Sequence, residues 1–231
     1  MRNVQITMSL TQQLLNLSQP GQLAQALHVV LVLTLLALCP TMLVMTTCFT
    51  RILVVLAFLR QALGSPSIPP NMVLIPLALM LTVLSMGPVL DDVYSHALQP
   101  ALDGKLSPLQ AYGAAARPLR AFMLGNTQQK DILILARAAR LGPFQSLEEI
   151  PLRLLVPAFA LSELRTAFRM GFTLFLTFLV VDLIVAGVLA ALGLFMLPPM
   201  SISLPLKLLL FVLVDGWALL CGSLIRSVHC P

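Results

Sequence analysis

Residues 172–197 read FTLFLTFLVVDLIVAGVLAALGLFML, and this stretch decides the class of fold. It is longer than the roughly 20 apolar residues that a helix needs to cross a bilayer, and its only charged residue is Asp182. A charge inside such a segment is costly and is retained where it has a partner or a function. The stretch therefore predicts a membrane protein and makes Asp182 a candidate functional residue.

The composition of the whole chain agrees with this prediction. Hydrophobic residues make up 58% of the chain and charged residues 10%, which is more apolar surface than a soluble core requires. The 231 residues leave room for about four spans and one polar segment. The net charge is +5, but the basic residues form no run, so we expect no nucleic acid as a partner.

Hydropathy, charge and turn residues divide the chain into four segments. These are a polar N-terminal tail (1–26), a first hydrophobic helical hairpin (27–90), a polar helical segment outside the cytoplasm (91–169), and a second hydrophobic helical hairpin with a short tail (170–231). The tail lacks the order of a cleaved signal peptide. The first arm of the first hairpin, Val29 to Leu59, is longer than one straight crossing and contains Pro40, so we expect it to kink or to protrude.

The polar segment carries the start and stop signals of short helices. Ser107-Pro108 is a helix start, an N-cap followed by proline. A second helix is predicted to begin near Thr127 and to end at Gly142-Pro143, and Ser146 with Glu149 has capping-box spacing for a third. The fold class that follows is an all-α membrane protein, in which two hydrophobic helical hairpins flank a segment of short amphipathic helices.

The last hairpin carries charges of both signs, because its second arm contains Lys207 and Asp215. With the first arm helical up to Pro198, Asp182 would lie roughly 24 Å before the turn, and a simple hairpin would not bring it to Lys207. Unpaired charges in hydrocarbon cost at least a few kcal/mol each, so we expect partners from another element or from another copy of the chain. Oligomerisation follows from this reasoning. The alternative is that the charges reach lipid headgroups or water within the single chain.

Five short motifs stand out along the chain: Phe49-Thr50-Arg51-Ile52, Arg60-Gln61-Ala62-Leu63-Gly64, Pro69-Pro70-Asn71, Leu161-Ser162-Glu163-Leu164 and Leu213-Val214-Asp215-Gly216-Trp217. They resemble motifs of the FliP/SctR family, the export-gate membrane proteins of bacterial type III secretion. They agree with the family in order and spacing, and the resemblance covers nearly everything from Pro40 to Ser227. The segment from Arg117 to Leu124 resembles the flagellar branch more than the injectisome branch.

The resemblance implies a function and a set of partners. It implies a core subunit of the flagellar protein export gate, in the bacterial inner membrane at the flagellar basal body. Several copies, a pentamer by this expectation, would assemble with FliQ-like and FliR-like proteins and membrane lipid into a helical oligomer. That oligomer would form a gated conduit for unfolded flagellar proteins.

The resemblance also implies roles for individual residues. Glu163, Asp182 and Lys207 match charged positions at subunit contacts of the family, an inter-subunit charge network. Leu194, Phe195 and Met196 occupy the position of a methionine run that forms a channel gasket, and only Met196 keeps the methionine. From the residues alone, ordinary packing at a helix end is the alternative for these three.

The sequence gives no support for an enzyme. His28, His96 and His229 have no carboxylate or cysteine at the spacing of a triad or a metal site, and no glycine-rich phosphate loop follows a strand. We therefore expect no catalytic residue, metal or cofactor. Two other functions stay open: a stand-alone membrane channel or secondary transporter with Asp182 as coupling site, and the injectisome counterpart of the same gate.

Overall fold

The computed structural model describes residues 20–65, 68–142, 144, 146 and 149–230, and over these residues it contains helices and no strand. The all-α prediction is confirmed for them. The chain divides into two compact units, Met1–Leu43 and Val44–Pro231. Most of the predicted polar tail, residues 1–26, lies outside the described residues.

Helix α2 (Pro20–Thr46) occupies the described part of the first unit and ends just inside the second. It continues through Pro40, and its apolar side chains from Leu27 to Met42 are largely exposed. The predicted single arm from Val29 to Leu59 is therefore wrong, because the helix ends at Thr46 rather than bending at the proline. The Thr47 hydroxyl accepts the Phe49 N–H at 3.4 Å and so helps to start a separate helix.

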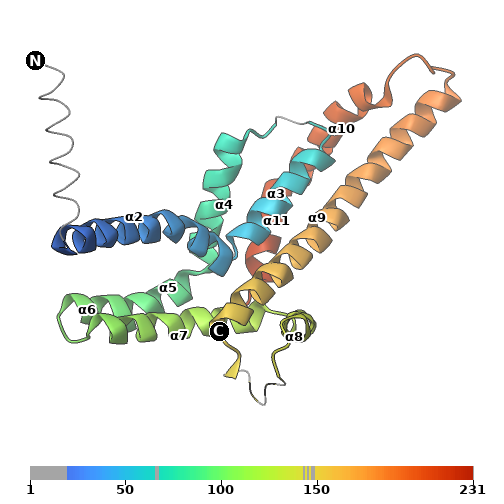
Figure 1. The fold of residues 1–231 in the computed structure, drawn as a ribbon. Helices are drawn as coiled ribbons and strands as arrows, with labels where there is room; N and C mark the ends of the chain where they lie inside the picture. The colour runs from blue at the N-terminus through green and yellow to red at the C-terminus, as the bar shows by residue number, and fades with distance from the viewer. Residues whose placement is uncertain (1–19, 66–67, 143, 145, 147–148, 231) are drawn as a thin grey trace, which may run out of the picture. The chain divides into compact units, whose positions relative to one another are not determined.

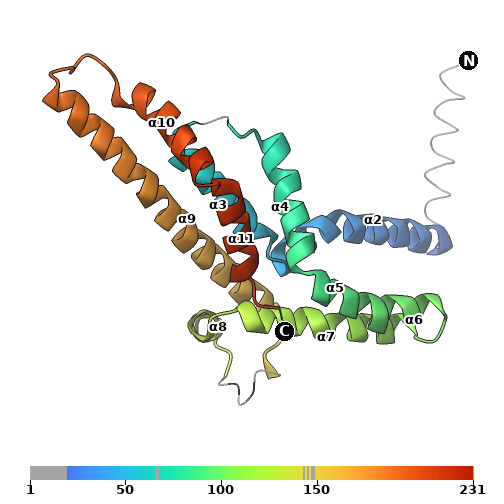
Figure 2. The ribbon, with the colours of Figure 1, turned by 180° about the vertical axis from the view of Figure 1, so that it is seen from behind.

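Helix α3 (Phe49–Ala62) is the centre of the second unit. Its buried residues recur at the spacing of one helix face, and they are Arg51, Ile52, Val55, Leu56, Leu59 and Ala62. One side of α3 packs on α4 (Asn71–Ser85) and the other on α9 (Leu152–Ala191). Figures 1 and 2 show α3 alongside α9 in both views.

A helical hairpin follows at one end of this unit. Helix α4 stops before Gly87-Pro88, and α5 (Gly87–Val93) leaves it at a bend of 66°. The chain continues through a π-helical turn, Tyr94–Leu98, and α6 (Gln99–Leu102). Helix α7 (Pro108–Asn126) then runs back along α5 and the π-helical turn. Ser107 and Gln110 form a capping box at its start, so the predicted start at Ser107-Pro108 is confirmed.

The second predicted helix of the polar segment ends earlier than expected. Helix α8 (Gln129–Ala138) begins where expected but ends before Gly142, since Arg140 adopts a left-handed conformation with φ of 54°. The predicted third helix, with Ser146 and Glu149 at capping-box spacing, lies partly outside the described residues, which leave out 147 and 148. The next helix that the structure describes is α9, which follows its N-cap Pro151 and runs for 40 residues. The predicted segment boundary at 169/170 consequently falls inside one continuous helix.

Helix α9 ends at Ala191, several residues before the Pro198-Pro199 turn, because Gly193 takes φ of 71°. The Leu194 N–H then bonds the Leu189 carbonyl at 2.9 Å and the Gly193 N–H bonds the Ala190 carbonyl at 3.1 Å, which is a Schellman ending. Helix α10 (Pro199–Leu213) returns along α9.

Helix α11 (Gly216–Ser227) leaves α10 at an angle of 67°. The break is formed by Asp215 with φ of 51° and by Gly216. A Cβ atom on Gly216 would come 2.3 Å from the Phe211 ring, which packs edge-on against Trp217 with ring centroids 5.4 Å apart.

Within the described residues, α9 is the one helix long and apolar enough to cross a membrane. The number of such spans rises to three if α4 with the helices after it, and α10 with α11, each count as one bent span. The four spans for which the sequence has room are therefore not all present as single straight helices.

The close contact between α3 and α9 gives the first test. A Cβ atom on Gly171 would lie 2.8 Å from the Cβ and 2.5 Å from the Cγ of Phe58, so Gly171→Ala must push the helices apart. We expect a loss of about 1–3 kcal/mol of stability, measured as a lower unfolding temperature of the protein in detergent.

Gly187→Ala in the same helix is the matched control, because nothing lies within 4 Å of its Cβ position. Alanine is the better helix former by about 1 kcal/mol, so this variant should unfold at the same temperature or higher. Equal unfolding temperatures for the two variants would contradict the close packing of α3 on α9.

Candidate functional site

The charges in the last two apolar stretches form an ion pair within the chain. The Lys207 ammonium donates to Oδ2 of Asp182 at 2.6 Å. Lys207 is 4% exposed and Asp182 is 35% exposed. The pair joins the middle of the apolar part of α9 to the middle of α10.

The prediction that a simple hairpin keeps Asp182 and Lys207 apart is wrong. Asp182 lies nine residues before the end of α9 at Ala191, and Lys207 lies eight residues after the start of α10 at Pro199. The two arms therefore place the charges at matching heights. The error came from extending α9 to Pro198, whereas Gly193 ends it earlier.

Lys207 also holds the end of α3. Its ammonium donates to the carbonyl of Ala62, the last residue of α3, at 3.0 Å. The carbonyls at the C-terminus of a helix carry a partial negative charge, so a cation is favoured there. Lys207 thus connects three helices, while Oδ1 of Asp182 is buried without a hydrogen-bond partner among the described residues.

Glu163 lies at a second site, where it pairs with Arg51. The Arg51 Nε donates to Oε2 of Glu163 at 2.9 Å, and Nη2 donates to Oε1, which makes a two-pronged contact between α3 and α9. Arg51 is 2% exposed and Glu163 is fully buried. The three predicted network residues therefore do not form one cluster within the chain, because Glu163 is roughly 28 Å along α9 from Asp182.

The remaining donors of Arg51 bind the last residues of α11 and α7. Nη1 donates to the carbonyl and to the hydroxyl of Ser227, and Nη2 donates to Oδ1 of Asn126 at 3.3 Å. The Asn126 side chain in turn bonds the backbone of His229 twice, at 2.6 Å and 3.1 Å. The thiol of Cys230 donates to the Ser85 carbonyl at 2.9 Å, and burial raises its pKa, which keeps the proton on sulfur.

A third charged contact fastens α8 to α9. Asp131 is fully buried, accepts a hydrogen bond from the Ser162 hydroxyl at 2.7 Å and lies 2.6 Å from the guanidinium of Arg165. Ser162 also accepts the Gln128 N–H at 3.0 Å. The sequence alone assigns no role to Asn126, Asp131 or Arg165, because no local pattern shows that an acid in a polar helix will be buried.

The three predicted gasket residues lie in the turn between α9 and α10. Leu194 is 43% exposed, Phe195 80% and Met196 97%. None of the three is buried in the core of its own chain.

The chemistry available to these sites is that of charge pairing and helix positioning. Among the residues that the structure describes, no three histidine, cysteine, aspartate or glutamate side chains come together as they would around a metal ion. The buried charges lie beside one another in pairs, and each pair joins two helices: α3 to α9, α9 to α10, and α8 to α9.

The Asp182–Lys207 pair gives the second test. Lys207→Met leaves the Asp182 carboxylate and the Ala62 carbonyl without their cation. We expect the free energy of unfolding to fall by about 3 kcal/mol. This is the lower end of the range for breaking a buried pair, because Asp182 is partly exposed. The double variant Asp182→Leu with Lys207→Met should regain most of this loss, since replacing both charges with apolar groups removes the unpaired carboxylate.

Lys105→Met is the matched control, because Lys105 pairs with Asp103 at 3.0 Å while its own side chain is 73% exposed. An exposed ion pair contributes less than about 1 kcal/mol to the stability of a protein, so Lys105→Met should lose no more than that. Unfolding of the purified chain in detergent measures these variants and Asp182→Leu alone. A double variant whose loss of stability equals the sum of the two single losses would contradict the internal pair.

Comparison with known proteins finds a family model and several relatives that match this chain. A sequence model described as the FliP family matches residues 32–224. The chain is 47% identical over 210 residues to a protein of Bacillus subtilis (strain 168) named flagellar biosynthetic protein FliP, covering 91% of this chain and 95% of that protein. It is 48% identical over 219 residues to the protein of the same name from Pectobacterium carotovorum subsp. carotovorum, covering 95% and 84%. A third, from Aquifex aeolicus (strain VF5), is 43% identical over 210 residues, covering 90% and 87%.

Proposed function

Because the chain belongs to the FliP family, we propose that it is a core subunit of the flagellar protein export gate. In this proposal several copies, a pentamer, assemble with FliQ-like and FliR-like proteins in the bacterial inner membrane at the basal body. Together they form a gated conduit for unfolded flagellar proteins. The observation that carries the proposal is the match over nearly the whole chain to proteins named flagellar biosynthetic protein FliP.

The surface of the second unit supports assembly in a membrane. Large apolar side chains are exposed along α9 and α10, among them Leu183 at 73% and Val212 at 70%. Apolar surface of this extent needs lipid or other subunits to cover it. The exposed apolar surface, and not unpaired charge, supports assembly, because Asp182, Lys207 and Glu163 all have partners within the chain.

The inter-subunit charge network of Glu163, Asp182 and Lys207 stays part of the proposal. Each residue already holds two or more helices of one chain together. Contacts between copies would then use the surfaces that these pairs position, or the buried Oδ1 of Asp182, which lacks a hydrogen-bond partner.

The gasket is likewise part of the proposal. The exposure of Leu194, Phe195 and Met196 in a turn, away from the core, suits side chains that meet the same turn of other copies around a channel. Two aliphatic or thioether side chains and one phenyl ring would close such a channel by packing, with less adaptability than three methionines.

Assembly and transport test the main proposal. In a flagellated bacterium that lacks its own gate subunit, the full chain should restore swimming, and detergent extraction with its partners should give a multimer. A monodisperse monomer that moves small solutes and does not restore flagella would favour a stand-alone channel or transporter. Restored secretion by an injectisome, without swimming, would favour the injectisome counterpart of the gate.

The gasket has its own test. Replacing Leu194, Phe195 and Met196 together by alanine removes most of the apolar bulk of the turn, so resting cells should leak small ions. Conductance or ion-sensitive dyes measure the leak, with Leu102→Ala as a control, because Leu102 is 76% exposed but lies at the other hairpin turn. Unchanged permeability in the triple variant would place the seal elsewhere.

A further inference from the structure

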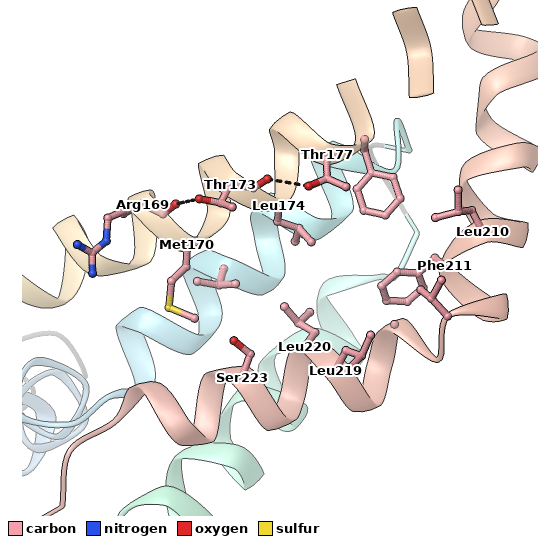
Figure 3. A pocket seen from close by; sticks show the side chains of 14 residues that line it. Arg169, Met170, Thr173, Leu174, Thr177, Leu210, Phe211, Leu219, Leu220 and Ser223 are labelled. Atoms are coloured by element: carbon pink, nitrogen blue, oxygen red, sulfur yellow. Dashed lines mark hydrogen bonds between the residues drawn. The ribbon is translucent and has the colours of Figure 1, made fainter. Parts of the chain in front are cut away.

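An apolar groove of about 520 Å³ runs along the flank of α9. Helix α9 forms one wall, α11 and the end of α10 form the other, and Val55 of α3 contributes to the lining. Figure 3 shows Arg169, Met170 and Ser223 toward one end of the groove and Leu210 and Phe211 toward the other.

The groove exists because α11 turns away from α10. Asp215 in its left-handed conformation and Gly216 form that break, and the Phe211 ring fills the space where a Gly216 side chain would stand. Phe211 and Gly216 both line the groove, so its shape is built into the fold rather than left by loose packing.

The polarity of the groove is uneven along its length. Thr173 and Thr177 lie in its wall, but their hydroxyls donate to carbonyls of their own helix, at 2.9 Å and 3.1 Å, so they add no free hydroxyl proton to it. Most other lining residues are apolar. The only charged one is Arg169, at one end, and it makes no ion pair with any described residue.

Arg169 also marks a border in α9. The helix from residue 170 to Ala191 contains one charged residue, Asp182, and is roughly 33 Å long, close to the thickness of about 30 Å of a hydrocarbon core. When this part crosses the bilayer, Arg169 lies at the level of the headgroups and the groove runs from there into the hydrocarbon.

We propose that this groove binds an anionic phospholipid, with one acyl chain along the apolar wall and the phosphate on Arg169. The apolar lining matches the acyl chain, and the unpaired guanidinium at the headgroup end matches the phosphate. Ser223 offers a hydroxyl at the same end. A bilayer lipid has this order of charge and apolar length, whereas an apolar helix of another subunit would bring no anion to Arg169.

The single tryptophan of the chain is a probe beside the groove. The ring of Trp217 packs on Phe211, and Phe211 lines the groove. The full chain, purified in detergent, is titrated with phosphatidylglycerol or phosphatidylcholine that carries bromine on its acyl chains, and the quenching of tryptophan fluorescence is followed. We expect quenching by brominated phosphatidylglycerol to saturate, with a half-saturating concentration about tenfold lower than that of brominated phosphatidylcholine. A difference of about tenfold in affinity is what one charge-assisted hydrogen bond contributes.

Variants separate this site from general lipid contact. Arg169→Gln should raise the half-saturating phosphatidylglycerol concentration about tenfold and remove the preference over phosphatidylcholine. Arg226 is an exposed arginine of α11 that does not line the groove. Arg226→Gln should therefore leave the half-saturating concentration and the lipid preference unchanged. Thr173→Phe, which fills the groove, should abolish the saturable phase while the unfolding temperature shows that the chain is folded.

Three results would overturn the proposal. Equal quenching by the two lipids, or an Arg169→Gln variant that behaves like the unchanged protein, would mean non-specific lipid contact. Absent quenching together with cross-linking of Thr173→Cys between copies would mean that a second copy covers the groove. Because the titration uses the purified chain without flagellar partners, its outcome is independent of the export-gate proposal.

Discussion

The two-pronged contact between Arg51 and Glu163 is the constraint on which the second unit depends. Both side chains are withdrawn from water, so removing either leaves an uncompensated buried charge at a cost of about 3–5 kcal/mol. The Arg51 guanidinium has five N–H donors, and Glu163, Ser227 and Asn126 accept from all three of its nitrogens. One side chain of α3 thereby fixes the ends of α7 and α11 as well as α9. A lysine could not do this, because its three donors all sit on one nitrogen.

Local signals were read correctly from the sequence where they lie in polar surroundings. Ser107-Pro108 starts a helix as predicted, because capping and proline geometry act over a few residues. The end of α9 was misread because Gly193 stands inside an apolar run, where glycine is also common within membrane helices. That single misplacement hid the Asp182–Lys207 pair, whose two members come into register only when α9 ends at Ala191.

The other charged contacts join residues that no local pattern connects. Arg51 and Glu163 each belong to a motif of the family resemblance, but their partnership spans most of the chain and depends on how α3 packs on α9. Asp131 reads as an ordinary acid in the first turn of a polar helix, yet it is fully buried against Ser162. Sequence periodicity shows which face of a helix is apolar, and it does not show which polar residue on that face will meet another.

The uninterrupted length of α9 has a mechanical consequence. It is held at Glu163 by Arg51 and, roughly 28 Å further along, at Asp182 by Lys207, so the two contacts fix α9 against α3 and α10 over that length. Only the last stretch of the helix, from Asp182 to Ala191 and roughly 14 Å long, lies beyond the second contact and carries the exposed turn at residues 192–198. The helix is thus a strut clamped at two points, and a repacking at its base displaces the turn only when the Asp182–Lys207 contact moves with it.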